Sequence, residues 1–504
     1  MYEYDFLIVG GGYAALVCAG YLVKAGFRVG VLEQAATVGQ PDEMDSHGGG
    51  SAHNLIQHTS VMHDLELTRY GLEYVDLDPL FFAPFPDGSH VFIWKDLDRT
   101  CDSITQVSPQ DAQAYRRFVQ RWQSFAAKLS QSFVAPPSPY ELGQYLLTTS
   151  ANDRLQWLSK MPAMMRSYGS VLRETFSSPQ IQALIGGVVA QSSVPPSAPM
   201  TASLALSYPM LHEHGLKLPQ GGFGMMKQAL VRMIEDYGGH IHTNSSVRSI
   251  LTRDKGVVGV ETSEGTRLSA RAVVASAHAP NTLSLLDVAI LATPRPRLPH
   301  SATARGSGVL VHYTMDELPD YTVLPSPADG SPGPQHKAPQ LICPPLDHLD
   351  GAYADSANGR STPELGLTVM PYSTGESSVA ADGKHTMALW GQQNSHQHSP
   401  GAGEMAVQML AVLGQYAPNV KHAVIDKVFD APTDQDAMVG LQHDSMTPLD
   451  RLVDQVLMRR LAHSMNGIRG PVANLYLIGE GTMHATGRNA ASIILQDFSR
   501  RYWR

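Results

Sequence analysis

The stretch Asp5-Phe6-Leu7-Ile8-Val9-Gly10-Gly11-Gly12-Tyr13-Ala14-Ala15 decides the fold. Residues 5–9 form a short apolar run of the kind that a buried parallel strand needs. Three glycines follow directly, and residues 16–23 then space apolar side chains along a helix that ends near Gly26. Residues 27–32 form a second apolar run, which Glu33 closes. The order strand, glycine turn, helix, strand and acid predicts a dinucleotide-binding unit.

Each part of this unit has a chemical reason. Gly10 allows a tight turn, and Gly12 lets the backbone approach a pyrophosphate because it carries no Cβ. The helix that starts near Tyr13 offers free N–H groups to the phosphates. Ala15 stands at the third glycine position, where Ala is an accepted variant. Glu33 lies about twenty residues past the glycines, where a carboxylate accepts hydrogen bonds from a ribose and repels a 2′-phosphate, so NADP is not expected. The alternative is a tight turn that binds nothing.

Length and composition exclude several classes of protein. A chain of 504 residues is too long for one core and predicts two or three lobes. The net charge of −9 gives no electrostatic footprint for nucleic acid. Three widely separated cysteines form neither a disulfide framework nor a zinc site. A nucleotide-binding strand that starts at residue 5 leaves no room for a signal peptide. We therefore expect a cytoplasmic protein. No apolar run is long enough to span a membrane, although peripheral membrane contact stays open.

The middle of the chain supplies a second lobe and then returns to the first. Residues 34–60 read as a loop at the ligand-binding edge, and their glycine triplet fits a cofactor approach and a flexible surface loop equally well. Residues 85–89 predict a hairpin turn. Residues 108–211 are mostly helical and form an insert, residues 225–277 return to the nucleotide lobe, and residues 305–430 alternate strand and helix signals.

The tail repeats the pattern of the first forty residues. Residues 474–478 predict a buried strand, Gly479-Glu480-Gly481-Thr482 a glycine-rich turn, and Gly487-Arg488-Asn489-Ala490-Ala491 the opening of a closing helix. A helix dipole and free N–H groups at this turn predict an anion-like atom beside it.

With these motifs in place, the sequence resembles the FAD-dependent phytoene desaturase-like oxidoreductases, a group within the flavin amine oxidase superfamily that includes carotenoid desaturases, carotenoid isomerase and retinol saturase. Four blocks carry the resemblance across nearly the whole chain: residues 10–33, 69–88, 219–224 and 474–491. It implies an α/β fold with a Rossmann-like FAD-binding lobe built from discontinuous segments, and a substrate lobe of mixed β-sheet and inserted helices. The implied boundaries are residues 1–95, 215–300 and 435–504 for the FAD-binding domain, and residues 96–214 and 301–434 for the substrate-binding domain.

The resemblance also implies site residues by position. Gly10, Gly12 and Ala15 would face the pyrophosphate, Glu33 the ribose, and the backbone of Val247 the adenine. The full set of cofactor-binding residues expected in this way is Gly10, Gly12, Tyr13, Ala14, Ala15, Glu33, Gln34, Val247, Gly479, Glu480, Thr482, Gly487, Asn489 and Ala490. Family members usually carry a longer glycine- and proline-rich stretch between the threonine and the second glycine block, where this chain has only Met483-His484-Ala485-Thr486.

The chemistry of such a site needs few acid or base groups. A flavin accepts a hydride, and the protein contributes orientation, electrostatics and water exclusion. His484, in the turn beside the expected flavin, is the candidate for proton transfer, with a loop-capping role as the alternative. His312 and His47 are weaker candidates, better explained as packed or solvent-facing. The histidine pairs at residues 212/214, 240/242 and 396/398 lack a full set of metal ligands, so no metal site is expected.

The function expected from the resemblance is an FAD-dependent dehydrogenase or desaturase acting on a small hydrophobic substrate, such as a polyene or a secondary metabolite. Two alternatives stay open. One is a flavin amine oxidase-like oxidation of a small amine or heterocycle, and the other is a reduced-flavin isomerase, or a flavin-binding protein without turnover.

Overall fold

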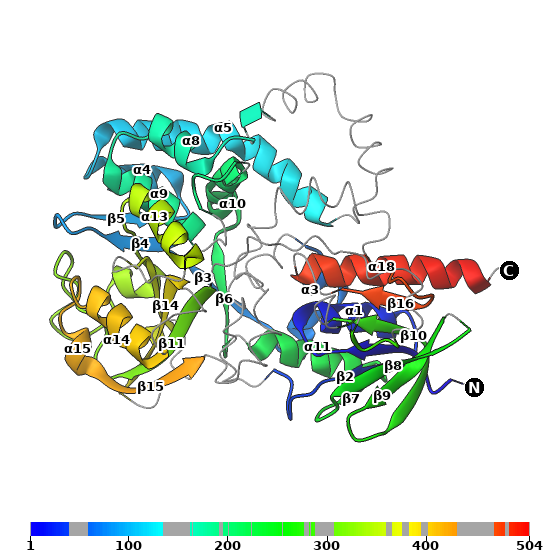
Figure 1. Ribbon diagram of the computed structural model, residues 1–504. Coiled ribbons are helices and arrows are strands. Elements are labelled where there is room, and N and C mark those ends of the chain that lie inside the picture. The colour runs from blue at the N-terminus through cyan, green and yellow to red at the C-terminus, as the bar shows by residue number, and fades with distance from the viewer. Residues whose placement is uncertain are drawn as a thin grey trace.

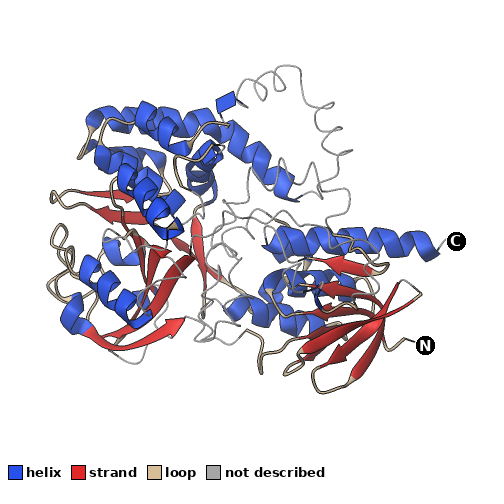
Figure 2. Cartoon of the chain, viewed as in Figure 1, coloured by secondary structure: helices blue, strands red, loops and turns tan. Residues whose placement is uncertain are grey.

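The computed structural model describes residues 2–39, 59–134, 162–163, 165–190, 195–199, 201–222, 224–254, 256–276, 282, 284–287, 307–358, 365–374, 383–394, 402–430, 468–478 and 483–502. Their strands form two seven-stranded sheets and one two-stranded sheet. The two large sheets, each with its own helices, divide the described chain into a first lobe and a second lobe (Figures 1 and 2).

The first sheet has a parallel half and an antiparallel half. Its order is β7 (His240–His242), β2 (Val29–Leu32), β1 (Tyr4–Val9), β10 (Arg267–Ala275), β9 (Gly256–Thr262) and β8 (Val247–Arg253), and β16 (Leu475–Leu477) also pairs with β10. The pairings of β1 with β2 and β10, of β2 with β7 and of β10 with β16 are parallel, whereas β8, β9 and the start of β10 are antiparallel. The carboxyl ends of the parallel strands therefore meet at one edge.

Strand β1 is buried on both sides, as the apolar run at residues 5–9 predicts. Phe6 and Ile8 face a core shared with α1 (Tyr13–Lys24), α11 (Gly224–Asp236) and α18 (Met483–Tyr502). Leu7 and Val9 face a second core, which the antiparallel strands β8 and β9 complete. Because successive side chains of a strand point to opposite faces, a continuous apolar run is what a strand between two layers requires.

The second sheet is mixed, and its two faces carry different helices. Its order is β15 (Val424–Asp430), β11 (Ser307–Met315), β14 (His385–Asn394), β13 (Leu367–Pro371), β12 (Gln340–Ile342), β4 (Phe81–Pro84) and β5 (His90–Ile93). One face packs against α14 (Ala402–Leu413) and α15 (Val420–Ala423). At the β4–β5 end, the other face is covered by α4 (Leu97–Thr105), α5 (Pro109–Val134), α8 (Tyr168–Thr175), α9 (Pro179–Ala190), α10 (Ser207–His214) and α13 (Leu346–Ala357).

Short elements join the two lobes and complete the first one. The antiparallel pair β3 (Tyr74–Leu77) and β6 (Leu216–Pro219) lies between the two lobes in Figure 1. The short helices α3 (Val61–Asp64) and η1 (Leu67–Tyr70) follow residue 58 and pack on the first lobe. Three further 3₁₀ turns are η2 (Thr201–Leu206), η4 (Pro334–Lys337) and η5 (Tyr372–Thr374).

The predicted fold class is confirmed, with a nucleotide-type lobe built from separate segments and a lobe of mixed sheet and inserted helices. The predicted hairpin is also present, because the amide of Phe85 donates to the carbonyl of Ser89 at 2.9 Å between β4 and β5. The domain boundaries stay a prediction. Strand pairing nevertheless puts β4 and β5, from the segment expected in the FAD-binding domain, in the second sheet.

The start of the closing helix differs from the sequence prediction. The helix was expected to open at Gly487, but α18 begins at Met483. A Cβ on Gly487 would lie 2.4 Å from the carbonyl oxygen of Ala14 and 3.0 Å from the Cβ of Val17. The glycine is therefore explained by close packing of α18 on α1 rather than by a turn.

Candidate cofactor and substrate site

The glycine turn lies at the carboxyl edge of the first sheet. The amide of Gly10 donates to the carbonyl of Leu32 at 2.8 Å, and the amide of Ser276, directly after β10, donates to the carbonyl of Val9 at 2.9 Å. Gly10 has a φ of +99°, a conformation that other residues rarely adopt. These contacts hold the turn between the ends of three parallel strands, where ligands bind in open α/β sheets.

The first turn of α1 has the features of an anion-binding helix start. Gly12 is its N-cap residue and gives no side-chain cap, and the first turn holds no acidic side chain. Amides at the start of a helix do not bond within the helix, and those of the first turn of α1 lie at the positive end of the helix dipole. Among the described residues, the one atom that a Cβ on Gly12 would meet within 4 Å is the Ser276 hydroxyl oxygen, at 3.8 Å. The space beside Gly12 therefore accommodates a ligand.

The side chains of the residues at the start of α1 have different surroundings. The ring of Tyr13 is buried in the first-lobe core, with the ammonium of Lys227 5.1 Å from the ring centre. Ala15 is fully buried in the same core, and the carbonyl of Ala14 is turned towards α18. These three residues can therefore serve a ligand at the helix end through their backbone amides.

Glu33 turns back onto the glycine turn. One carboxylate oxygen accepts from the amide of Gly11 at 2.6 Å, and the other accepts from the amide of Ala35 at 2.9 Å. Carboxylate oxygens have further lone pairs, so Glu33 can also accept hydrogen bonds from ribose hydroxyls at this edge. Gln34 is exposed beside it, and Val247 packs on the apolar cluster that contains Leu32.

Ser276 is a neighbour of the turn that the sequence analysis missed. Its Cβ and hydroxyl are the atoms that a side chain on Gly10 or Gly12 would approach first. A polar residue directly after a buried parallel strand lies at the ligand edge, but the sequence does not show where this strand ends.

Helix α18 brings the second glycine block to the same edge. Asn489 is only 3% exposed, and its side-chain oxygen finds no hydrogen-bond partner among the described residues. Ala490 is fully buried in the first-lobe core. A buried acceptor without a partner is destabilising by about 1–3 kcal/mol unless a ligand or a water satisfies it. Gly479, Glu480 and Thr482 lie outside the described residues, as does the side chain of His484.

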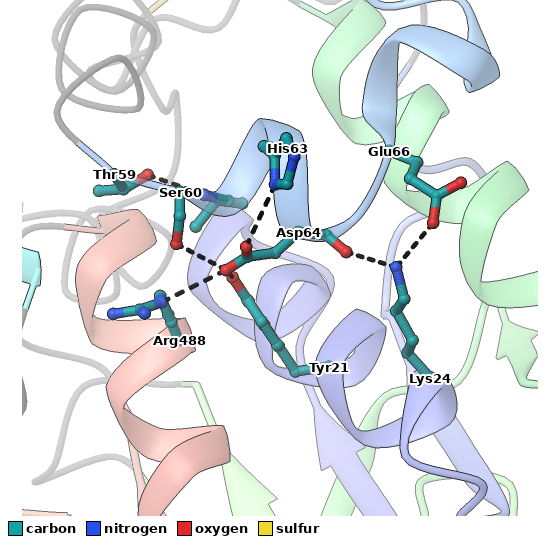
Figure 3. A network of polar contacts seen from close by, with 9 residues as sticks. Tyr21, Lys24, Thr59, Ser60, His63, Asp64, Glu66 and Arg488 are labelled. Atoms are coloured by element: carbon teal, nitrogen blue, oxygen red, sulfur yellow. Dashed lines mark hydrogen bonds and ion pairs between the residues drawn. The ribbon is translucent and has the colours of Figure 1, made fainter.

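A polar cluster fixes α18 to the rest of the first lobe (Figure 3). The carboxylate of Asp64 accepts from the hydroxyls of Tyr21 at 2.5 Å and Ser60 at 2.6 Å, and the guanidinium of Arg488 lies 3.6 Å away. Burial alone would raise the pKa of Asp64, but the hydrogen bonds and the Arg488 charge outweigh it and hold that pKa below its usual range. The arginine of the second glycine block is therefore explained by a structural role.

An open depression of about 750 Å³ lies beside this cluster. Its lining residues are Tyr21, Lys24, Met62, His63, Asp64, Glu66, Thr68 and Arg69. Tyr21 and Lys24 belong to the last turn of α1, whereas the amides expected to bind phosphate belong to its first turn. The depression is therefore distinct from the candidate nucleotide site.

The second lobe carries an unusual set of polar side chains on one sheet face. His312 on β11 is directly opposite Ala388 on β14, and the pairs Leu310/Trp390 and Thr314/Thr386 flank it. We call these six residues the polar face. Their neighbours in sequence, such as Val311 and Leu389, point the other way into the core under α14.

The polar face holds three side chains with buried, unpaired polar atoms. Among the described residues, no partner exists for either ring nitrogen of His312, for the hydroxyl of Thr386 or for the indole nitrogen of Trp390. His312 is 6% exposed, and burial lowers its pKa to about 4, so the ring is neutral at pH 7. His312 is packed, as expected, but its ring nitrogens have no hydrogen-bond partner among the described residues.

The other histidines singled out in the sequence have ordinary partners or lie outside the described residues. His240 and His242 share one face of β7 and both contact the Tyr4 hydroxyl, at 3.2 and 2.9 Å. His212 contacts the Tyr115 hydroxyl at 2.8 Å and the Lys95 carbonyl at 3.0 Å. Residues 47, 396 and 398 are not described. Within the described part of the chain, no group of three or more metal-ligating side chains occurs.

The family model for FAD-dependent oxidoreductases matches residues 5–332, and the chain belongs to this family. It is 24% identical to pyridine nucleotide-disulfide oxidoreductase domain-containing protein 2 of Rattus norvegicus, over 98% of this chain and 94% of the relative. It is also 24% identical to phytoene desaturase (lycopene-forming) of Pantoea ananas, over 95% of each chain. A variant of putrescine oxidase shares the fold, with a TM-score of 0.58 at 18% identity over 98% of this chain and 99% of that one.

The protein is therefore an FAD-dependent oxidoreductase, and FAD is its cofactor. The described residues fit this cofactor: the absence of a side chain at Gly12 and the dipole at the start of α1 suit a pyrophosphate, Glu33 suits a ribose, and the unpaired oxygen of Asn489 suits a hydrogen-bond donor. The individual roles of these residues stay predictions. When bound, FAD supplies the hydride acceptor. Among the described helices, none is both long and apolar enough to cross a membrane.

Proposed function

We propose that this protein is a dehydrogenase or desaturase that takes a hydride from a small hydrophobic substrate held against the second sheet. The observation that carries the proposal is the polar face, whose polar atoms on His312, Thr386 and Trp390 are buried and whose histidine is neutral. Hydride transfer to a flavin needs a dry, oriented site rather than a strong acid or base. The proposal agrees with the name of the Pantoea ananas relative, which is a desaturase of phytoene.

The first lobe's share of this function is cofactor binding. The first-turn amides of α1 would bind the pyrophosphate, and Glu33 would accept hydrogen bonds from the ribose. The side-chain oxygen of Asn489 would accept a hydrogen bond from the cofactor, and the Asp64–Arg488 contact would keep the start of α18 in place. His484, in the first turn of α18, stays the proposed proton-transfer residue.

A small protonated amine suits the polar face less well. Transfer of a positive charge from water to a buried site is strongly unfavourable without a counter-charge. The six residues of the polar face include no carboxylate. Asp426, on the same side of the neighbouring strand β15, is exposed. The amine oxidase likeness concerns the fold alone, at 18% identity.

Anaerobic reduction of the bound flavin tests the proposal. The purified protein is first saturated with FAD, and the visible flavin band is then followed after addition of farnesol, phytoene or putrescine. We expect at least one of the two hydrophobic compounds, and not putrescine, to bleach the band. Bleaching by putrescine alone would support amine oxidation instead. Isomerisation of a polyene by the pre-reduced protein, with no net change of flavin oxidation state, would support the isomerase alternative.

A further inference from the structure

We propose that the polar face binds a neutral hydrogen-bonding group of the substrate, a hydroxyl or a carbonyl, so that the substrate is an oxygenated hydrophobic molecule rather than a pure hydrocarbon. This inference rests on the proposed function and names the substrate class for that site. It stands on the juxtaposition of His312, Thr386 and Trp390 on one face of strands β11 and β14.

The three side chains are close enough to act on one ligand. In an antiparallel pair, diagonal neighbours lie about 7–8 Å apart, within reach of aromatic side chains. His312 is directly opposite Ala388, so Thr386 and Trp390 are its two diagonal neighbours. Thr386 and Trp390 are separated by about 13 Å along β14. The methyl group of Ala388 is the smallest side chain available between them and leaves room beside the imidazole.

The unpaired atoms call for a partner. Buried polar atoms in native proteins are hydrogen-bonded in about nine cases out of ten. On the polar face, four such atoms from three residues have no partner among the described residues. Isolated exceptions occur in many structures, but a group of exceptions on one face of two adjacent strands indicates a common missing partner.

The orientation of the polar face agrees with a role towards the substrate. The opposite face of β11 and β14 packs on α14. In Figure 1, α14 and α15 lie on the outer side of these strands, away from β6 and the first lobe. The polar face is therefore turned to the side on which the cofactor-binding lobe lies. Met370, on the adjacent strand β13, packs against the core formed by the inserted helices, which closes the face on its other side.

The hydrogen-bonding capacity of the face selects the ligand's chemistry. Trp390 can only donate, Thr386 can donate and accept, and a neutral His312 has one donor and one acceptor nitrogen. A carbonyl can accept from these donors, and a hydroxyl can accept from one side chain and donate to another. A hydrocarbon would leave all four atoms unpaired. A cation would lack a counter-charge on the six residues of the face.

Three probes with the same fifteen-carbon skeleton test the inference: farnesol, farnesene and farnesylamine. Each is titrated into the FAD-loaded protein, and the visible flavin spectrum reports binding near the cofactor. We expect farnesol to bind about tenfold or more tightly than farnesene or farnesylamine, because each 1.4 kcal/mol of hydrogen bonding gives a factor of ten. Equal binding of farnesol and farnesene, preference for farnesylamine, or failure of farnesol to bind would overturn the inference.

Three substitutions locate the preference: His312→Leu, Thr386→Val and Trp390→Phe. Each should retain bound FAD and lose the preference for farnesol. Thr252→Val, at a partly buried strand position of the first sheet, is the matched control and should keep it. A second readout is independent of any probe. If the polar atoms await a ligand, His312→Leu and Thr386→Val leave the melting temperature of the substrate-free protein unchanged or raise it.

A structural role gives a different pattern. If His312 and Thr386 serve the fold, the variants melt at lower temperature than the wild type and still prefer farnesol, and the inference is then wrong. The proposed function fails separately. Flavin reduction by hydrophobic substrates without any preference for oxygen would leave the dehydrogenase standing and overturn the oxygenated substrate. A farnesol preference that depends on the polar face, without flavin reduction by any hydrophobic compound, would support the oxygenated ligand and overturn the dehydrogenase.

Discussion

The edge of the first sheet that carries the turn at Gly10–Gly12, called the glycine edge below, and the polar face of the second lobe offer different kinds of atoms to a ligand. The glycine edge offers backbone: amides at the end of α1, glycines without side chains, and a carboxylate that folds back onto the turn. The polar face offers side chains, with four buried polar atoms whose partners are not among the described residues. A backbone site of this kind buries no unpaired side-chain atom, so the protein does not depend on the ligand for its stability. A side-chain site of this kind destabilises the protein until the ligand arrives.

This difference assigns the two ligands. A backbone site suits a cofactor whose phosphates are common to many proteins, since amides and a helix dipole recognise any such anion. A site made of three particular side chains suits a molecule that only this protein and its near relatives use. We therefore expect substitutions at the glycine edge to change cofactor content, and substitutions on the polar face to change stability and substrate preference without changing cofactor content.

The largest effect should come from Gly12→Val. The backbone of Gly12 has φ −69° and ψ 166°, which any residue adopts, and the one atom of the described residues within 4 Å of an added Cβ is the Ser276 hydroxyl oxygen, at 3.8 Å. The new side chain would therefore occupy ligand space without straining the fold. We expect FAD binding to weaken by about 100-fold, equivalent to about 3 kcal/mol, with little change in the melting temperature of the cofactor-free protein. Flavin fluorescence titration measures it, and Gly351→Val, where nothing lies within 4 Å, is the control.

The second effect concerns the acid stability of the polar face. Burial lowers the pKa of His312 from 6.5 to about 4, so the unfolded chain binds a proton before the folded chain does as the pH falls. The contribution to stability is complete above about pH 6.5 and is lost as the pH falls to about 4, by up to about 3 kcal/mol. The difference in melting temperature between His312→Leu and wild type should therefore grow on acidification. His422→Leu, at an exposed position, should show no such growth. Parallel profiles of His312→Leu and wild type would contradict the prediction.

Gly487→Ala should have a moderate effect on stability and cofactor binding together. The added Cβ would lie 2.4 Å from the carbonyl oxygen of Ala14, so α18 must move away from α1. Overpacking of this kind destabilises a protein by about 1–3 kcal/mol. Thermal unfolding and flavin content measure the two consequences, and Gly351→Ala in helix α13 is the matched control. An unchanged melting temperature would show that α18 can move away from α1 without loss of stability.

The smallest effect should come from Asp64→Asn. The pKa of Asp64 is held low, so its contribution to stability is present above about pH 4 and is lost as the pH falls through the folded-state pKa. We expect a loss of about 1–2 kcal/mol at pH 7 that disappears in acid. Asp316→Asn removes an ion pair with Lys384 whose carboxylate is 54% exposed, and should lose less than about 1 kcal/mol. Equal losses for the two variants would argue against a special role for the Arg488 contact.

The elements around the glycine edge could be predicted because their signals are local. Residues 5–9 predicted a strand that the structure has at Tyr4–Val9, and the helix and second strand follow at Tyr13–Lys24 and Val29–Leu32. Gly487 was assigned to the start of the closing helix, because a glycine at a helix start and a glycine that allows close helix packing look alike in sequence. Ser276 was missed because the sequence does not show that β10 ends at Ala275, directly before it.

The sequence by itself determined the fold class, the FAD-binding unit and the family, because a strand, a turn and a helix of successive residues bind the cofactor mainly through backbone atoms. Only the tertiary structure brought His312 together with Thr386 and Trp390, and Asp64 together with Arg488. A strand's alternation tells which residues share a face, but the register between distant strands decides which side chains meet on it. The cofactor was therefore predictable from the sequence, whereas the candidate substrate site depended on strand pairing between separate segments.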